Sequence, residues 1–300
     1  MILFKEIKIQ LGSILELNSD IEEKLGWKPG QIFEKTGIKQ RFISSESETA
    51  ESMAISAFSQ FDETLISDLD AIISVTNTPS CLFPSISNFV FTNSKLDRDI
   101  HCLGINAGCT GYVDALRIVY SLFESNQIKK AVIITADTYS KFIAENDRSI
   151  RSLFSDGATA TLLEKNDQGF KLKNNVFSSK KNTESALIRN AMDGIIEMNG
   201  PKVLQFALSK VSPEIKQLLS STKNCNIFPH QAGKIVLDAL SKDIPTGCNI
   251  FTNYDEVGNL VSSSIPKLIH DNFENFNSSQ TVLLSGFGVG LSHSSFLLEK

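Results

Sequence analysis

One order of sequence patterns occurs twice along the chain, and this repeat restricts the possible folds more than any other feature. In each half a β-like run, a helical pattern, a second β-like run, a turn, a long helical pattern and another β-like run follow one another. Each half ends on the letters Leu-Leu-Glu-Lys, at residues 162–165 and 297–300. Such a duplication predicts two similar units packed together. We place their boundary near residues 166–169, which gives halves 1–168 and 169–300.

Strand and helix patterns alternate within each half, which predicts a layered α/β fold. The clearest helix follows Cys109, because apolar residues recur there at three- and four-residue steps from residue 113 to residue 123. Further helices are predicted over residues 201–219 and 260–273 and from near residue 231. The predicted strands are residues 70–75, 100–105, 130–136, 158–163, 226–228 and 281–285.

Composition excludes several classes of protein. No apolar run approaches the roughly 20 residues that cross a bilayer, and the N-terminus lacks an apolar signal core. The five cysteines include no C-x-x-C pair, which predicts free thiols in a reducing cytoplasm and no metal site. A net charge of -5 without a long basic run argues against nucleic acid or an anionic membrane as the partner. We therefore expect a small or carrier-bound substrate.

Cys109 is a candidate nucleophile. It has a glycine on each side at a predicted strand-to-helix turn, and glycine permits close approach of a substrate. The positive field of a helix N-terminus is expected to favour the thiolate and lower the pKa of the thiol. A buried structural cysteine is the alternative that the motif alone leaves open.

Two residues of the second half are candidate partners of Cys109. His230 is expected at the end of an apolar strand, where a histidine is either functional or a hydrogen-bonded surface group. Asn259 is expected at the start of a helix, where its ordinary role is an N-cap. Asn259 occupies the place in the second half that Cys109 occupies in the first. Packing of two equivalent halves would bring both helix N-termini to one site.

Four motifs follow one another along the chain. They are Gly108-Cys109-Thr110-Gly111, Pro229-His230-Gln231-Ala232, Gly258-Asn259 with Ser262, Ser264, Ile265 and Pro266, and Gly286-Phe287-Gly288-Val289-Gly290. In this order they resemble the β-ketoacyl-acyl-carrier-protein synthase III family, and their joint occurrence in register is far more specific than any one of them. Further landmarks of the family are found at residues 35–41, 83–85, 147–148 and 198–200.

The resemblance implies a duplicated thiolase fold, layered α-β-α-β-α with two pseudo-twofold halves, that acts as a homodimer without a cofactor or metal. Cys109 would take an acyl group from an acyl-CoA. His230 and Asn259 would stabilise the enolate formed when a malonyl-acyl carrier protein, or malonyl-CoA, loses carbon dioxide. The backbone N–H groups of Cys109 and Val289 would form the oxyanion hole.

The resemblance also implies residues that bind substrate. Phe83 would reach the partner's acyl pocket, Arg148 would contact the CoA nucleotide, and Gly288 and Phe206 are assigned to substrate binding. The family's adenine-stacking tryptophan has no aligned counterpart, since Gln31 occupies its place and Trp27 lies four residues earlier. An arginine that docks the carrier protein is replaced by Ile235, which leaves Lys234, Lys202 and Lys210 as substitutes.

Three alternatives were weighed. A thiolase-fold acyltransferase would pass the acyl group to an amine or hydroxyl without decarboxylation, and the presence of Asn259 argues against it. A papain-like hydrolase also uses Cys, His and Asn, but its local cysteine signature is absent. A non-catalytic partner subunit would be marked by loss of the cysteine, whereas Cys109 is present.

Overall fold

A computed structural model describes residues 1–189 and 194–300, and these residues form two mixed five-stranded sheets. The first sheet has the strand order β1-β7-β6-β4-β5. Strands β6, β4 and β5 are parallel, whereas β7 is antiparallel to both β6 and β1. Its strands are β1 (Ile2–Leu11), β4 (Ala71–Thr76), β5 (His101–Asn106), β6 (Lys130–Asp137) and β7 (Gly157–Lys165).

The second sheet repeats the first. Its order is β12-β11-β13-β14-β8, with β12, β11 and β13 parallel and β14 antiparallel to both β13 and β8. Strand for strand, the chain order and the directions match those of the first sheet, which is the topology expected of a duplicated unit. Its strands are β8 (Lys171–Ser179), β11 (Cys225–Pro229), β12 (Cys248–Ile250), β13 (Thr281–Gly288) and β14 (Ser292–Glu299).

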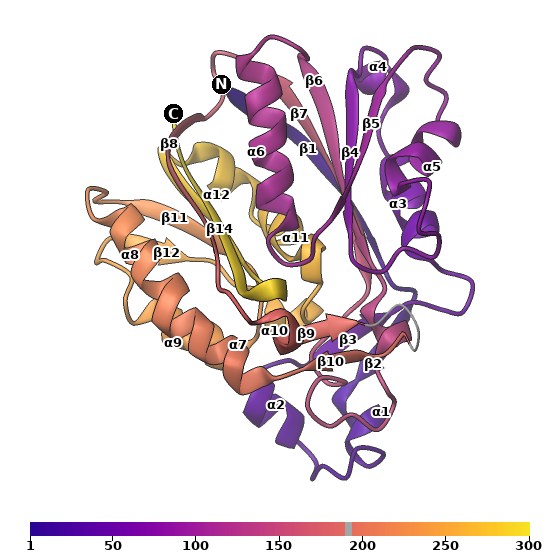
Figure 1. Cartoon of the computed structure of the whole chain (residues 1–300), viewed down its shortest axis with the longest axis vertical. Coiled ribbons are helices and arrows are strands. Elements are labelled where there is room, and N and C mark those ends of the chain that lie inside the picture. Colours follow the sequence, from indigo (N-terminus) through magenta and orange to yellow (C-terminus); the bar gives the residue numbers. More distant parts are fainter. Residues whose placement is uncertain (190–193) are drawn as a thin grey trace.

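Helices separate and cover the two sheets, so the predicted layering α-β-α-β-α is confirmed (Figure 1). The inner layer holds α6 (Gly111–Glu124) and α11 (Ser264–Asp271), the equivalent helices of the two halves. Helices α3 (Ala50–Phe58) and α5 (Ile86–Thr92) cover the first sheet on its outer side. Helices α8 (Ser212–Leu219) and α9 (Lys234–Ser241) cover the second.

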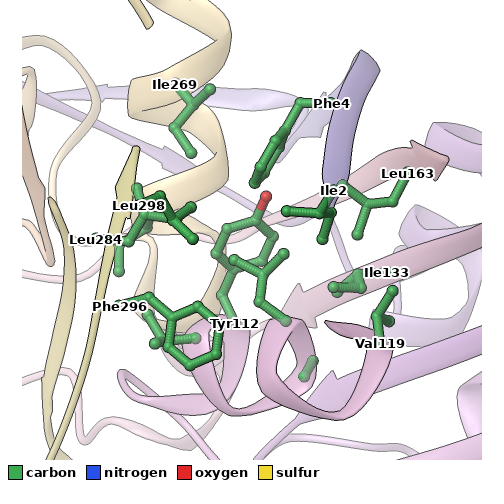
Figure 2. Packing of buried hydrophobic residues seen from close by; sticks show 14 of the residues in the cluster. Ile2, Phe4, Tyr112, Val119, Ile133, Leu163, Ile269, Leu284, Phe296 and Leu298 are labelled. Atoms are coloured by element: carbon green, nitrogen blue, oxygen red, sulfur yellow. The ribbon is translucent and has the colours of Figure 1, made fainter. Parts of the chain in front are cut away.

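The central core fills the space between the sheets around α6 and α11. Figure 2 shows Tyr112 and Val119 of α6 among residues of both sheets, with Ile2, Phe4 and Ile133 on one side and Leu284 and Phe296 on the other. These apolar side chains are almost completely buried. Because α6 packs on both sheets, the position of its N-terminus, just after Cys109, is fixed by the largest core cluster of the molecule.

The remaining elements are short or connect the layers. Between β9 and β10 the chain passes through residues 190–193, which lie outside the described part. The elements are β2 (Ile14–Leu17), α1 (Asn18–Glu22), α2 (Gln31–Thr36), β3 (Gln40–Ile43), α4 (Glu63–Ile66), η1 (Tyr139–Phe142), η2 (Glu184–Ala186), β9 (Leu187–Arg189), β10 (Ile196–Met198), α7 (Gly200–Phe206), η3 (Ala207–Val211), α10 (Tyr254–Val257), η4 (Val261–Ser263), α12 (Phe273–Ser278) and η5 (Val289–Leu291). In the described ranges, no helix combines the length and apolar character needed to cross a membrane.

Several predicted boundaries are wrong. The helix expected from residue 260 to residue 273 starts as a 3₁₀ turn, η4, and its α-helical part ends at Asp271. The helix expected near residue 231 begins at Lys234, because the chain first turns at Gly233 with φ 104°. The stretch 201–219 is helical throughout, but η3 in its middle is a π-helix. Strand β1 was not predicted, although it pairs with β7 along its length.

Candidate active site

A cavity of about 910 Å³ brings together the three residues expected to carry the chemistry, Cys109, His230 and Asn259. Cys109 comes from the first half, in the turn between β5 and α6, and the other two come from the second half. His230 follows β11, and Asn259 precedes η4 and α11. The cavity therefore lies where equivalent loops of the two halves meet, as the pseudo-twofold arrangement predicts.

The state of the Cys109 thiol differs from the sequence-based expectation. Burial raises its pKa to about 12, and the charge of Asp137 adds to the rise, while a hydrogen bond from the backbone N–H of Val289 opposes it. The side chain is only 4% exposed. Desolvation thus outweighs the field of the α6 N-terminus, and the expectation of a lowered pKa is wrong. The Cys109 side chain is therefore a neutral thiol near pH 7.

The loop after β13 approaches the sulfur closely because of Gly288. This residue has φ 152°, and a Cβ built on it would lie 2.8 Å from the Cys109 Sγ. Glycine is therefore required here both by the backbone angle and by the space. Val289 follows, and its backbone N–H and that of Cys109 itself both act on the sulfur. The two predicted oxyanion donors thus converge on one point.

His230 is buried beside Phe287, whose ring meets the imidazole edge to face at a centroid distance of 5.7 Å. Burial lowers the pKa of His230 to about 3, against the effect of a backbone hydrogen bond with Val261. The imidazole is therefore neutral near pH 7. Within the part of the chain that the structure describes, its Nδ1 has no hydrogen-bond partner. Nδ1 is enclosed by protein, although His230 as a whole lines the cavity.

Hydrogen bonds to the Oδ1 atom of Asn259 orient its side-chain amide. The Oδ1 atom accepts a hydrogen bond from the backbone N–H of Val261 at 2.9 Å and a longer one from the Ser264 hydroxyl at 3.5 Å. The backbone of Asn259 is paired with Leu153 and Ser155 on both sides. Since Oδ1 is engaged on the protein side, the Nδ2 group remains as a donor for the cavity. In this arrangement Val261 has φ 52°, which is a strained angle for a β-branched residue.

Asp137, which was not predicted from the sequence, connects the two halves beside the site. This carboxylate is fully buried at the end of β6 and accepts hydrogen bonds from the backbone and hydroxyl of Ser262, in η4. It also accepts from the backbone of Asn77 and from the Thr78 hydroxyl. Burial nevertheless raises the pKa of Asp137 to about 6. Asp137 positions the segment that carries Asn259, and it has no motif that marks it.

The mouth of the cavity carries an aromatic and cationic cluster formed by Trp27, Lys35 and Arg148. Arg148 lies over the Trp27 ring, with its Cζ 4.8 Å from the centroid, and donates a hydrogen bond to the Gly26 carbonyl. Lys35 also contacts this ring, at 4.4 Å. Trp27 lies here although it stands four residues before the position expected for the adenine-stacking tryptophan. That position is taken by Gln31, the first residue of α2. Trp27 is the only tryptophan of the sequence, and this could have identified it as the stacking residue.

The other predicted binding residues lie apart from the thiol. Phe83 is 85% exposed on the loop before α5. Phe206 is 1% exposed and belongs to the core beneath the second sheet, whereas its neighbours Leu204 and Gln205 line the cavity. The structure thus places Phe206 behind the cavity wall.

Comparison with known proteins agrees with this geometry. Residues 103–181 match the family 3-oxoacyl-[acyl-carrier-protein (ACP)] synthase III, and residues 225–300 match the C-terminal part of the same family. The chain is 30% identical to the β-ketoacyl-[acyl-carrier-protein] synthase III of Streptococcus agalactiae serotype III (strain NEM316) over 305 residues, covering 94% of each chain. It is 31% identical to that of Streptococcus thermophilus (strain LMD-9), again covering 94% of each.

The same agreement holds among solved structures. The 3-oxoacyl-[acyl-carrier-protein] synthase III from Aquifex aeolicus VF5 superposes with a TM-score of 0.89 at 26% identity, covering 100% of both chains. The thiolase fold expected from the sequence motifs is therefore confirmed over the full length.

Proposed function

Because the chain belongs to the 3-oxoacyl-[acyl-carrier-protein] synthase III family of condensing enzymes, we propose that Cys109, His230 and Asn259 are its catalytic residues. The reaction would join an acyl group to the carbon unit left when a malonyl thioester loses carbon dioxide. The observation that carries the proposal is the convergence of all three side chains on one cavity from the two halves of the molecule.

In the first step Cys109 would take the acyl group of an acyl-CoA. The sulfur attacks the thioester carbonyl, the carbon–sulfur bond to CoA breaks, and the thiol proton ends on the CoA sulfur. The resting thiol is neutral, so its proton must leave during the attack, and the neutral His230 in the same cavity is the available relay. The oxyanion of the intermediate would receive the backbone N–H groups of Cys109 and Val289.

In the second step a malonyl thioester would occupy the same cavity. Its carbonyl oxygen would accept hydrogen bonds from the imidazole N–H of His230 and the Nδ2 group of Asn259. As carbon dioxide leaves, the electron pair of the broken carbon–carbon bond becomes the enolate, whose charge these donors stabilise. A neutral imidazole suits this role, because it carries one N–H and adds no charge of its own.

In the last step the enolate carbon would attack the acyl carbonyl on Cys109. The new carbon–carbon bond forms, the bond to the Cys109 sulfur breaks, and solvent returns a proton to the thiolate. These three reaction steps give a role to Cys109, His230 and Asn259. The Asn259 amide favours condensation over simple acyl transfer, since a transferase that does not decarboxylate has no enolate to stabilise.

The mouth of the cavity supports an acyl-CoA as the first substrate. The Trp27 ring with the Arg148 guanidinium offers a flat surface and a fixed positive charge, which suit the adenine and phosphates of CoA. For the malonyl carrier, Lys210 and Lys234 are each paired with a carboxylate on their own helix. Lys202, which is exposed in α7, is then the best candidate to meet an acidic carrier protein.

The edge of the first sheet supports the proposed homodimer. Strand β5 is paired only with β4 in the described residues, and an open strand edge normally pairs or is covered. Beside it, Leu82 and Phe83 project with more than four-fifths of their surface exposed. A second copy would cover these side chains, and sedimentation of the protein at assay concentration tests this. The five free cysteines support the proposed cytoplasmic location.

The proposal is tested by incubating the protein with acyl-CoA and measuring its intact mass. Wild-type protein should gain the mass of one acyl group, which hydroxylamine at neutral pH should remove because it cleaves thioesters, and the Cys109→Ala variant should gain none. A malonyl thioester should then remove the acyl group from wild type with release of carbon dioxide. Transfer of the acyl group to an amine or alcohol without carbon dioxide release would instead establish the acyltransferase alternative.

A further inference from the structure

Two cysteines that the proposed reaction does not use lie opposite each other on neighbouring strands of the second sheet. Cys225 begins β11 and Cys248 begins β12, and the parallel pairing of these strands sets the two residues in register. Figure 1 shows β11 and β12 next to each other. Both side chains pack on the apolar cluster under α8 and α9, so they lie on the same face of the sheet. Both are free thiols.

The positions of the two thiols suit a disulfide. Neighbouring strands lie about 4.7–4.9 Å apart, and disulfides join residues whose Cα atoms are about 4.4–6.8 Å apart. Burial raises the pKa of Cys248, and a hydrogen bond from the backbone N–H of Cys225 opposes this rise. The Cys248 sulfur therefore already lies against the residue with which it would react.

The Cys225 sulfur needs one side-chain rotation to meet its neighbour. Burial raises the pKa of Cys225 to about 12, the charge of Cys248 adds to the rise, and the backbone N–H of Leu283 opposes it. Leu283 belongs to β13, which lies on the side of β11 away from β12. A turn about the Cα–Cβ bond to another staggered position would bring the sulfur toward Cys248.

The place of β12 in the sheet permits the small movement that a disulfide requires. The bond draws two Cβ atoms to about 3.5–4.5 Å, which is less than the spacing of neighbouring strands. Strand β12 can shift because it has only three residues and, among the described residues, pairs with β11 alone. A disulfide formed against such a displacement is easily reduced again, which is typical of regulatory bonds and not of structural ones.

The two thiols differ in their access to solvent. Cys248 is partly exposed, whereas Cys225 is only 3% exposed. A reagent from solution can therefore reach Cys248 first, and Cys225 can react only with a group that is already attached to Cys248. This difference gives each thiol its own part in an oxidation.

We propose that Cys225 and Cys248 form a redox-sensitive pair that a small disulfide, such as oxidised glutathione, converts into a disulfide bond. The Cys248 thiolate attacks one glutathione sulfur, the glutathione disulfide breaks, and the departing glutathione takes up the Cys248 proton. Cys225 then attacks the Cys248 sulfur, and the second glutathione leaves with the Cys225 proton. Two cysteines are oxidised, and one glutathione disulfide is reduced to two thiols.

The bond would join the two strands that lead to the proposed catalytic residues of the second half. Cys225 lies at the start of β11, and His230 directly follows the end of that strand. The chain from β12 continues through residues 251–258 to Asn259. The pair is thus a modification site on the framework of the active site, distinct from the nucleophile Cys109.

The test is incubation of the full-length protein with oxidised glutathione at mildly alkaline pH, followed by digestion and mass spectrometry without reducing agent. Wild-type protein should yield linked peptides that contain Cys225 and Cys248, and dithiothreitol should separate them. Cys225→Ala removes the second thiol, so glutathione should remain attached to Cys248. Cys225→Ser serves the same purpose if the alanine variant does not fold. Cys248→Ser removes the accessible thiol and should leave Cys225 unmodified.

The matched control is Cys102→Ser, which removes a thiol from β5, the strand of the first sheet that is equivalent to β12. This variant should form the linked peptides to the same extent as wild type. If wild-type Cys248 keeps its glutathione and no linked peptide forms, the two thiols do not meet and the inference is overturned. Absence of any modification at Cys248, in wild type and in the Cys225 variants alike, would overturn it equally.

Discussion

Replacing Asn259 by aspartate tests the amide donor with almost no change in shape. Asp keeps an oxygen in the place of Oδ1, so the hydrogen bond from the Val261 N–H, 2.9 Å in length, is preserved. What it loses is the Nδ2 donor, and near pH 7 it brings a negative charge toward a developing enolate. Loss of one such donor costs about 100–1000-fold in rate, or about 2.7–4 kcal/mol.

The charge adds to this cost. Two like charges about 4 Å apart repel by about 4 kcal/mol at an effective dielectric constant near 20. We therefore expect Asn259→Asp to decarboxylate a malonyl thioester at least about 1000-fold more slowly than wild type, and more slowly than Asn259→Ala. Its thermal stability should stay closer to wild type than that of Asn259→Ala, which also loses the bond to Val261.

Carbon dioxide release from a malonyl thioester, in the absence of any acyl-CoA, is the assay. Acylation of Cys109, followed by mass, is the control and should change little in Asn259→Asp. A decarboxylation rate within about threefold of wild type would instead show that the amide donates nothing to the enolate.

Three further predictions concern the thiol, the glycine-rich loop and the mouth of the cavity. Burial raises the pKa of Cys109 to about 12, so the rate of its alkylation by iodoacetamide should still increase about tenfold per pH unit above pH 9. A rate that reaches a plateau below pH 9 would show that α6 stabilises the thiolate. Gly288→Ala should reduce acylation at least about 100-fold, since the added Cβ would lie 2.8 Å from the Cys109 Sγ, and acylation at the wild-type rate would contradict the clash. Arg148→Ala, and likewise Trp27→Ala, should raise the KM for acyl-CoA about tenfold with little change in kcat, and an unchanged KM would assign the pair a structural role.

Much of the fold could be predicted because its core strands are short apolar runs bounded by turns. The expected runs at residues 70–75 and 100–105 differ from β4 and β5 by one residue at each end. Strand β1 was not predicted, although charged and apolar residues alternate along most of it. The adjacent Lys5 and Glu6 interrupt this alternation where the pairing with β7 shifts register, between Phe4 and Glu6. Pairing with a distant strand, and not local pattern, makes that segment extended.

The residues of the candidate site that stand in a sequence motif were predicted. A residue whose role depends only on its burial was not. Cys109, His230 and Asn259 each stand in a recognisable motif, and the structure brings them together. Asp137 carries no such signal, since its importance comes from being enclosed by donors that are distant in sequence.

The pKa of Cys109 could not be predicted from sequence for the same reason. Its position before α6 was anticipated, but the desolvation that raises the pKa depends on how the Gly288 loop closes over the sulfur. Helix termini can be read from local sequence, whereas the burial of a side chain depends on the whole packing around it.

We propose that one cavity carries two separable half-reactions, acyl transfer by Cys109 and decarboxylation supported by His230 and Asn259. Both half-reactions can be measured on the Cys109→Ala variant. This variant should form no acyl-enzyme but still release carbon dioxide from a malonyl thioester, because the donors for the enolate remain in place. A Cys109→Ala protein that is folded, yet as inactive in decarboxylation as Asn259→Ala, would contradict the division of roles.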